Sequence, residues 1–185
     1  MTGFIEDDYK VPTTSGYFRF QEGENRIRIL GSFIDKTAIR GMEYWTTDDK
    51  GVRKPNRVHE GDPIPVHEIE LNPKTGKPEM PKYFWAFPVW SFRDSRIQIM
   101  ELTQKTVINA IKSLAENNAW GDPENYTISI VKGTDNGKVT YSVLPEPKSE
   151  MPHEAGEALF TTPVRIEALF SGLDPFEMEK PKATK

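Results

Sequence analysis

The chain has 185 residues, 36% hydrophobic and 28% charged, with no cysteine, which permits one domain with a sizeable core and excludes disulfides and cysteine-ligated zinc. No apolar run reaches the length of a membrane span and the acidic start is no signal peptide, so we expect a cytoplasmic protein without a membrane partner. The net charge of −4 is uneven: residues 1–24 hold two basic and five acidic residues, residues 146–185 five and eight, and residues 25–145 seventeen and fifteen. A mildly basic body between acidic ends is compatible with a polyanionic ligand, and also with a plain solvated surface.

The sequence divides into an arm, a body with one insertion, and a tail. Residues 1–16 are polar and predict a flexible N-terminal arm. Residues 17–148 predict the folded domain. Within it, residues 46–81 are rich in proline and poor in apolar periodicity, which predicts a long loop insertion. Residues 149–185 predict an acidic, partly disordered C-terminal tail that contains a short helix and a short docked segment.

Three strands are expected before the insertion. Tyr17–Phe20 is a short candidate, and another lies within Phe33–Trp45. In Asn25–Leu30, apolar and basic residues alternate, which predicts a strand with its two isoleucines on one face and Arg26 and Arg28 on the other.

The stretch Lys82–Leu102 predicts an aromatic hairpin with a turn at Arg93–Ser95. Strand alternation places aromatic rings on both faces of its first strand, with Tyr83 and Trp85 on one face and Trp90 on the other. One face can join a core. The second face needs a cover, which is another strand, a partner chain or flat nucleobases.

The remaining elements are one helix and a second hairpin. Gln104–Asn117 carries an apolar stripe opposite a polar one, with Thr103 as the expected N-cap. Tyr126–Lys132 and Lys138–Leu144 flank an Asn-Gly pair, which is a strong hairpin signal. A single helix between the third and fourth strands predicts a mainly β protein, and specifically a five-stranded Greek-key barrel of the OB-fold with a long loop insertion.

Aromatic and basic residues are interleaved along the predicted strands and loops. Binding of single-stranded nucleic acid requires this combination, because cations neutralise phosphates and aromatic rings stack on bases. The competing interpretation is that most of these rings belong to the core, and we assign Trp85 and Phe87 to the core for that reason.

Catalytic and metal-binding signals are weak. The three histidines, His59, His67 and His153, lack metal-ligand spacing, so we expect no metal and no cofactor. No nucleophile motif is present, and the acidic residues of the insertion only loosely resemble a metal-dependent nuclease site. We therefore expect no enzymatic activity.

An ordered series of short motifs resembles the single-stranded DNA-binding proteins of bacteriophages and prophages. The matching pieces are Ser15–Phe20, Gly23–Leu30, Gly41–Trp45, Phe84-Trp85, Leu102–Gln104, Trp120–Pro123, Tyr141–Val143 with Pro145 and Pro147, and Asp174–Phe176. The resemblance implies an OB-fold that coats single-stranded DNA, without sequence preference, during phage DNA replication and recombination in the cytoplasm of the bacterial host. It also implies that a tail centred on Asp174, Phe176 and Glu177 recruits replication or recombination proteins.

The sequence thus predicts a DNA-binding set of basic and aromatic residues: Arg26, Arg28, Arg40, Tyr44, Trp45, Arg53, Arg57, Lys82, Tyr83, Trp90, Arg93 and Lys132. A homodimer or a cooperative array on DNA is a further expectation. The alternative function is that of a phage structural or adaptor protein, which uses the aromatic hairpin as a protein interface.

Overall fold

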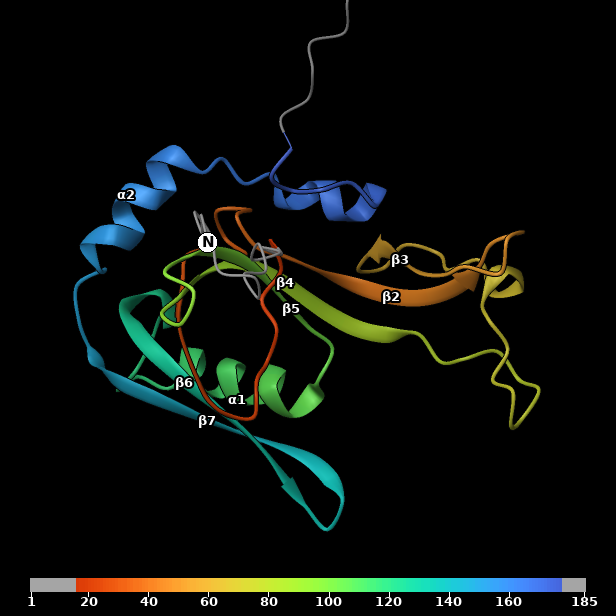
Figure 1. Ribbon diagram of the computed structural model, residues 1–185, viewed down its shortest axis with the longest axis horizontal. Helices are drawn as coiled ribbons and strands as arrows, with labels where there is room; N and C mark the ends of the chain where they lie inside the picture. The colour runs from red at the N-terminus through yellow and green to blue at the C-terminus, as the bar shows by residue number, and fades with distance from the viewer. Residues whose placement is uncertain (1–15, 178–185) are drawn as a thin grey trace, which may run out of the picture.

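The computed structural model describes residues 16–177, which form a mainly antiparallel β structure with helices on both sides of the sheet (Figure 1). The strands are β1 (Gly23–Ile29), β2 (Ile39–Thr47), β3 (Arg53–His59), β4 (Lys82–Ser91), β5 (Arg96–Leu102), β6 (Tyr126–Asp135) and β7 (Lys138–Lys148). The helices are α1 (Lys105–Glu116) and α2 (His153–Thr161), with short 3-10 segments η1 (Val66–Glu68), η2 (Pro123–Asn125) and η3 (Ile166–Ser171). The predicted arm lies outside the described residues.

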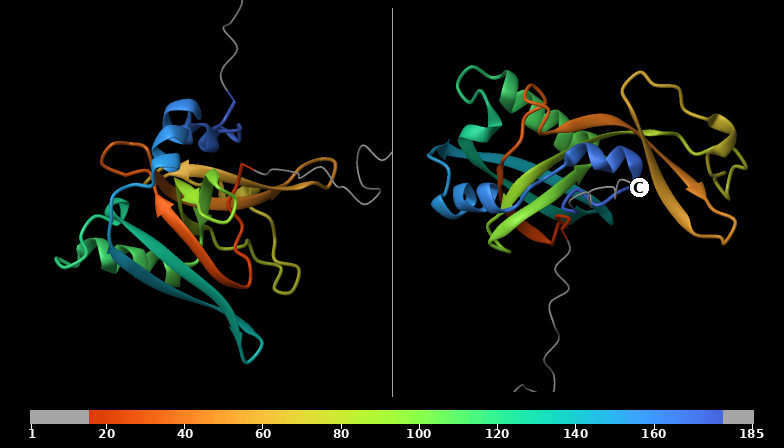
Figure 2. Two further views of the ribbon diagram at one scale, coloured as in Figure 1. Left: turned by 60° about the vertical axis from the view of Figure 1, so that its left-hand side comes forward. Right: turned by 90° about the horizontal axis from the view of Figure 1, so that it is seen from above.

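The sheet branches at the long central strand β4. Strand β5 pairs with one edge of β4, while β1 and β2 both pair with the opposite edge, β1 near Trp90 and β2 near Trp85. Residues 30–38 leave the sheet between β1 and β2, next to Pro88 of β4. The chain passes so close to this proline that a Cβ atom placed on Gly31 would lie 2.8 Å from the Pro88 ring. The β1 branch continues into β6 and β7, and the β2 branch continues into β3, so the two hairpins project in different directions (Figures 1 and 2).

The sheet does not close into a barrel. Within residues 16–177, β7 pairs only with β6, and β5 pairs with β4 and, through one parallel bridge, with Tyr17. Helix α1 lies between β5 and β6 in the chain and packs against β5 and β7, which are the two strands that closure would have to join. The prediction of a mainly β fold is confirmed. The five-stranded closed barrel is not, because the sheet has seven strands and branches.

Apolar residues are buried on both faces of β4. Phe87 and Val89 join the core beneath α1, whose stripe of Val107, Ile108 and Ile111 is buried as predicted. The helix begins one residue later than expected, so Gln104 rather than Thr103 is the N-cap.

The opposite face of β4 is covered by the C-terminal part of the same chain. Phe84 and Ala86 pack against Ile166 and Leu169 of η3, and Trp90 packs against Ala155 of α2. Figure 1 shows α2 and η3 above the sheet and α1 below it. The α2 and η3 part of the predicted tail therefore supplies the cover that the second aromatic face requires.

The predicted insertion is also more ordered than a loop. Strand β3 pairs with β2 along seven residues. The first pair is Gly41 with His59, and the last is Thr47 with Arg53. The rest of the insertion folds back on β2, since the Glu70 amide donates to the Trp45 carbonyl and the Glu79 amide donates to the Glu70 carbonyl. The segment lacks apolar alternation because both faces of β3 are largely solvated.

Both predicted hairpins are confirmed, and the second one provides a test of turn chemistry. Asn136 and Gly137 join β6 to β7 with φ values of +48° and +75°, as a tight hairpin turn requires. We expect Gly137→Ala to lower the free energy of unfolding by about 1 kcal/mol, because alanine is strained at positive φ. Urea denaturation measures this cost.

The matched control is Gly156→Ala in α2. No atom lies within 4 Å of a Cβ placed at Gly137 or at Gly156, so the two substitutions differ only in backbone conformation. The helical site should be neutral or stabilised by up to about 1 kcal/mol. Equal destabilisation at the two sites would contradict the turn assignment.

Candidate nucleic-acid interface

A groove of about 930 Å³ runs between strand β3 and the C-terminal residues 169–174. Its lining combines basic and aromatic side chains from distant parts of the chain, together with two carboxylates: Tyr17, Phe18, Arg19, Tyr44, Lys54, Arg57, Glu101, Phe170 and Asp174. Two arginines, one lysine and several rings in one groove are the combination that single-stranded nucleic acid requires.

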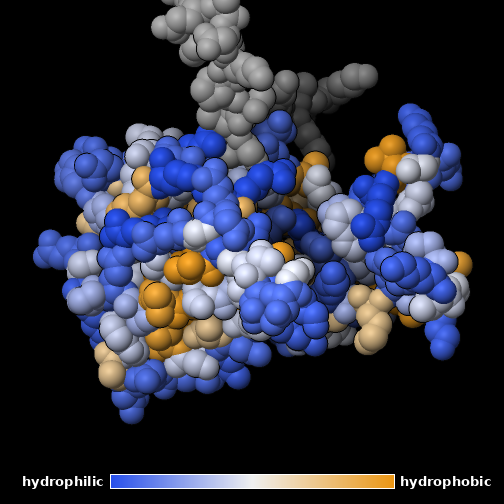
Figure 3. All heavy atoms as spheres, turned by 60° about the horizontal axis from the view of Figure 1, so that its bottom comes forward, coloured by the Kyte–Doolittle hydropathy of each residue, from blue (hydrophilic) through white to orange (hydrophobic). Residues whose placement is uncertain are grey.

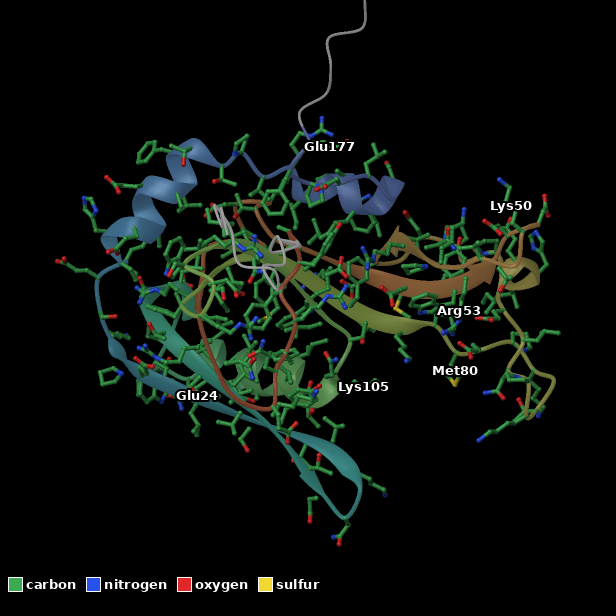
Figure 4. The ribbon with its side chains drawn as sticks, in the orientation of Figure 1. Glu24, Lys50, Arg53, Met80, Lys105 and Glu177 are labelled. Carbon is green, nitrogen blue, oxygen red and sulfur yellow. The ribbon has the colours of Figure 1, made fainter. Side chains whose placement is uncertain are left out.

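Trp45 lies on the β2–β3 hairpin, next to this groove but outside its lining. It is paired with Pro55, which lines the groove. The guanidinium of Arg53 lies 4.4 Å from the centre of the Trp45 ring, a cation–π contact that fixes the indole. Arg53 is itself held by ion pairs to Glu70 and, at 2.8 Å, to Glu79. In Figure 4, Arg53 and Lys50 both lie towards the far end of the β2–β3 hairpin, on the right-hand side of the view.

Register decides which other predicted residues share this face. Glu43 pairs with both Arg57 and Lys82, so these side chains lie on the face of the sheet that carries Trp45. Tyr83 is paired with Met42 and therefore lies on the opposite face. Arg40 is two residues before Met42 on the same strand, so its side chain also lies on the face opposite Trp45. The structure brings together Trp45, Arg53, Arg57 and Lys82, and it separates Arg40 and Tyr83 from them.

The floor of the groove holds a charge network around Arg57. Its guanidinium lies 3.0 Å from Glu43 and 2.9 Å from Glu101, and the side chain is only 10% exposed. Burial raises the pKa of the Glu101 carboxyl above its ordinary value, while the neighbouring Arg57 opposes this shift. Arg57 was predicted to bind phosphate, and here it neutralises two carboxylates.

The raised pKa of Glu101 predicts a specific dependence of stability on pH. The folded state binds this proton more tightly than the unfolded chain, so ionisation of Glu101 destabilises the fold as pH rises from the ordinary glutamate pKa of 4.5 through the raised value. We expect Glu101→Gln to gain stability relative to the wild type as pH rises above 4.5. Thermal denaturation across this range measures the difference.

Glu146→Gln is the control of opposite sign. A hydrogen bond from Arg26 lowers the pKa of the Glu146 carboxyl, so this carboxylate stabilises the fold above its ordinary pKa and the stabilisation is lost as pH falls. The Gln variant should therefore lose stability relative to the wild type as pH rises. Parallel pH profiles for the two variants would contradict the assignment of Glu101.

Three predicted binding residues are buried, and we exclude them from the interface. Arg28 is 2% exposed, and its guanidinium donates to the Glu124 carbonyl at 2.7 Å and the Ser149 carbonyl at 2.6 Å. Trp90 is 6% exposed beneath α2, and Tyr44 is 8% exposed, although this residue is part of the groove wall. The strand pattern placed them on a free face, which other parts of the chain cover.

The other predicted arginines are exposed and already paired. Arg26 bonds to Glu146 at 2.6 Å, Arg40 to Glu60 at 3.1 Å and Arg93 to Asp94 at 3.0 Å. A hydrogen bond to the same Glu60 raises the pKa of the exposed Tyr83 hydroxyl. A phosphate would have to replace these carboxylates, so such arginines bind anions less readily than their number suggests.

The two predicted lysines and the tail residues occupy different places. No ion pair joins Lys82 or Lys132 to another of the described residues, and both lie outside the groove lining. Lys82 shares the sheet face of Trp45, whereas Lys132 lies on the β6–β7 hairpin. Phe176 was predicted to be an exposed partner-binding residue and instead packs against both clusters of the covered face. Asp174 lines the groove, and Glu177 is exposed.

Sequence analysis missed several groove residues. Arg19 and Lys54 are exposed and basic, and Phe170 stacks on His59 with ring centres 3.7 Å apart. The alternation of aromatic and basic residues in Tyr17–Phe20 was a usable signal for Arg19. Nothing local in the sequence connects Phe170 with a strand more than a hundred residues earlier.

No protein-family model matches the chain, and no curated protein matches it. Among residues 16–177, no cluster of three or more His, Asp or Glu side chains is arranged to hold a metal ion. No helix in the same range is long and apolar enough to cross a membrane.

Proposed function

We propose that this protein binds single-stranded DNA without sequence preference and protects it, in phage DNA replication or recombination. The observation that carries the proposal is the groove between β3 and residues 169–174, whose lining combines Arg19, Lys54 and Arg57 with aromatic rings. Trp45 lies next to this groove, paired with Pro55 of its lining. The function is non-catalytic. The phage setting rests on the motif resemblance alone.

Each part of the groove has a distinct role in the proposal. Arg19 is exposed and neutralises backbone phosphate in the groove, and Arg53 contacts phosphate at the Trp45 end. Lys82, which is exposed and lies on the same face as Trp45, supplies a third phosphate contact. Trp45 stacks on a base, its indole held by Arg53. Stacking is insensitive to base identity because every base has a π-face. Glu101 and Asp174 in the same groove repel the phosphates, which lowers the affinity.

The branched sheet fits a modified OB plan, which we propose as the fold type. β1 and β2 together act as one long first strand along β4, and α1 fills the gap between β5 and β7. In the OB-fold, the outer face of the central strands binds oligonucleotides. Here α2 and η3 cover that face, so the proposed DNA path is displaced towards β3.

The alternative function, a protein interface built on the aromatic hairpin, has little exposed hairpin surface to use: Tyr83 is exposed, while most of the other rings are covered within the chain. Phe84 and Ile99 are fully buried beneath η3, and Phe87 and Met100 lie in the core on the α1 side. The observations therefore favour DNA binding.

Titration of tryptophan fluorescence with oligo-dT tests the proposal. We expect quenching that added salt reverses, with a log–log slope of affinity against salt near −2 for about three phosphate contacts on a single strand. Trp45→Phe should abolish the quenching, whereas Trp120→Phe should retain it, because Trp120 packs against the core. An affinity that does not change with salt would overturn the proposal.

A further inference from the structure

The outer surface of helix α2 carries large apolar side chains where polar ones are expected. The face towards the sheet uses small residues, with Ala155 fully buried and Ala158 packed beside it. Phe160 is 95% exposed, and Leu159 is 36% exposed. A surface helix normally buries its large apolar residues and exposes polar ones, so this arrangement is typical of a helix packed between its own sheet and a second surface.

A cavity of about 780 Å³ opens directly beside Phe160, and the exposed ring forms part of its rim. The cavity floor is apolar, with contributions from Trp90, Ile97 and Phe176. The cavity is much larger than a phenyl ring. Its rim is acidic on the α2 side, at Glu154 and Glu157, and basic on the β5 side, at Arg96.

An exposed ring and an apolar cavity on one patch are self-complementary. In a two-fold dimer the same patch faces itself, so a protruding group and the cavity that accepts it must lie side by side on each copy. The rim charges satisfy the same requirement, since a two-fold axis sets the acidic α2 side of one copy against the basic β5 side of the other.

We propose that a second copy of this chain occupies the cavity, with Phe160 of each protomer inserted beside Trp90 and Ile97 of its partner. Phe160 lies outside the lining of the proposed DNA groove, so this interface is independent of DNA binding. The patch is confined to one nine-residue helix and one cavity, so the dimer is small and dissociates at micromolar concentrations.

Sedimentation velocity from low micromolar to several hundred micromolar protein tests the proposal. The wild type should shift from monomer to dimer over this range, and Phe160→Ala should remain monomeric. Glu157→Arg should weaken association, because it reverses the charge of the acidic rim. Added salt should weaken the wild-type dimer as well.

Ile34→Ala is the matched control. Ile34 is 92% exposed and lies on the 30–38 segment, outside the cavity lining, so its loss should leave dimerisation unchanged. All three side chains are exposed, and unchanged melting temperatures verify that the variants fold. A wild type that stays monomeric at every concentration, or equal loss of dimer in Ile34→Ala and Phe160→Ala, overturns the proposal.

Discussion

Replacing Trp45 by alanine is expected to weaken the binding of oligo-dT by about 5- to 150-fold, because stacking of a base on an aromatic ring contributes about 1–3 kcal/mol. The substitution also removes the surface on which the Arg53 guanidinium rests, 4.4 Å from the ring centre. Fluorescence anisotropy with a labelled oligonucleotide at fixed low salt measures the affinity. The loss should affect all base compositions similarly, since stacking does not recognise base edges.

Tyr83→Ala is the control for this prediction. Tyr83 is exposed and aromatic, like a stacking residue, but strand register places it on the opposite face of the sheet from Trp45. Its replacement should change the affinity by less than about twofold, within what a surface substitution away from the groove produces. A larger loss for Tyr83→Ala than for Trp45→Ala would place the DNA on the other face and overturn the proposed path.

Replacing Arg28 by alanine is expected to lower the free energy of unfolding by about 3 kcal/mol, because it removes a buried side chain together with three hydrogen bonds from its charged guanidinium. Arg28 donates to the carbonyls of Glu124 and Ser149 and to the Ser149 hydroxyl at 3.1 Å. These bonds tie β1 to the turn before β6 and to the start of the C-terminal segment. Urea denaturation of the variant and the wild type measures the loss.

The control is Arg26→Ala, two residues earlier on the same strand. The Arg26 side chain is 41% exposed and its ion pair with Glu146 is at the surface, so its removal should cost at most about 1 kcal/mol. Neither variant should change oligo-dT affinity more than twofold under conditions in which it is folded. An Arg28→Ala protein that keeps its stability but loses DNA binding would return Arg28 to the interface.

The surface of the molecule agrees with a few localised sites rather than one large apolar interface. The face shown in Figure 3 carries apolar side chains in patches that hydrophilic residues separate. Exposed large apolar residues such as Ile34, Met80 and Phe160 lie on different elements. Isolated exposed apolar residues are common in folded proteins, so a function is inferred only where such a residue adjoins a cavity.

Local signals in the sequence predicted β1, the two hairpins and α1 because these elements depend on nearby residues. At β3 the sequence predicted a loop instead, and the predicted strand Tyr17–Phe20 contributes an isolated bridge at Tyr17 rather than a strand. Alternation of Ile27 and Ile29 with basic residues and the Asn136-Gly137 pair act over a few positions, and the structure has β1 and the β6–β7 hairpin where they indicate. The aromatic content of Tyr83–Phe92 correctly indicated that both faces of β4 need a cover.

What covers each face was decided by contacts between residues far apart in the chain. Ile166 and Leu169 reach back to Phe84, and Ser149 lies 121 residues from the arginine that it binds. Alternation along a strand states which side chains share a face but not which face remains exposed. The sequence by itself therefore determined the elements and the supply of basic and aromatic residues. Only the tertiary structure decided that Arg28 and Trp90 are buried while Trp45, Arg19 and Lys54 border a groove, because burial depends on which distant segment packs against each strand.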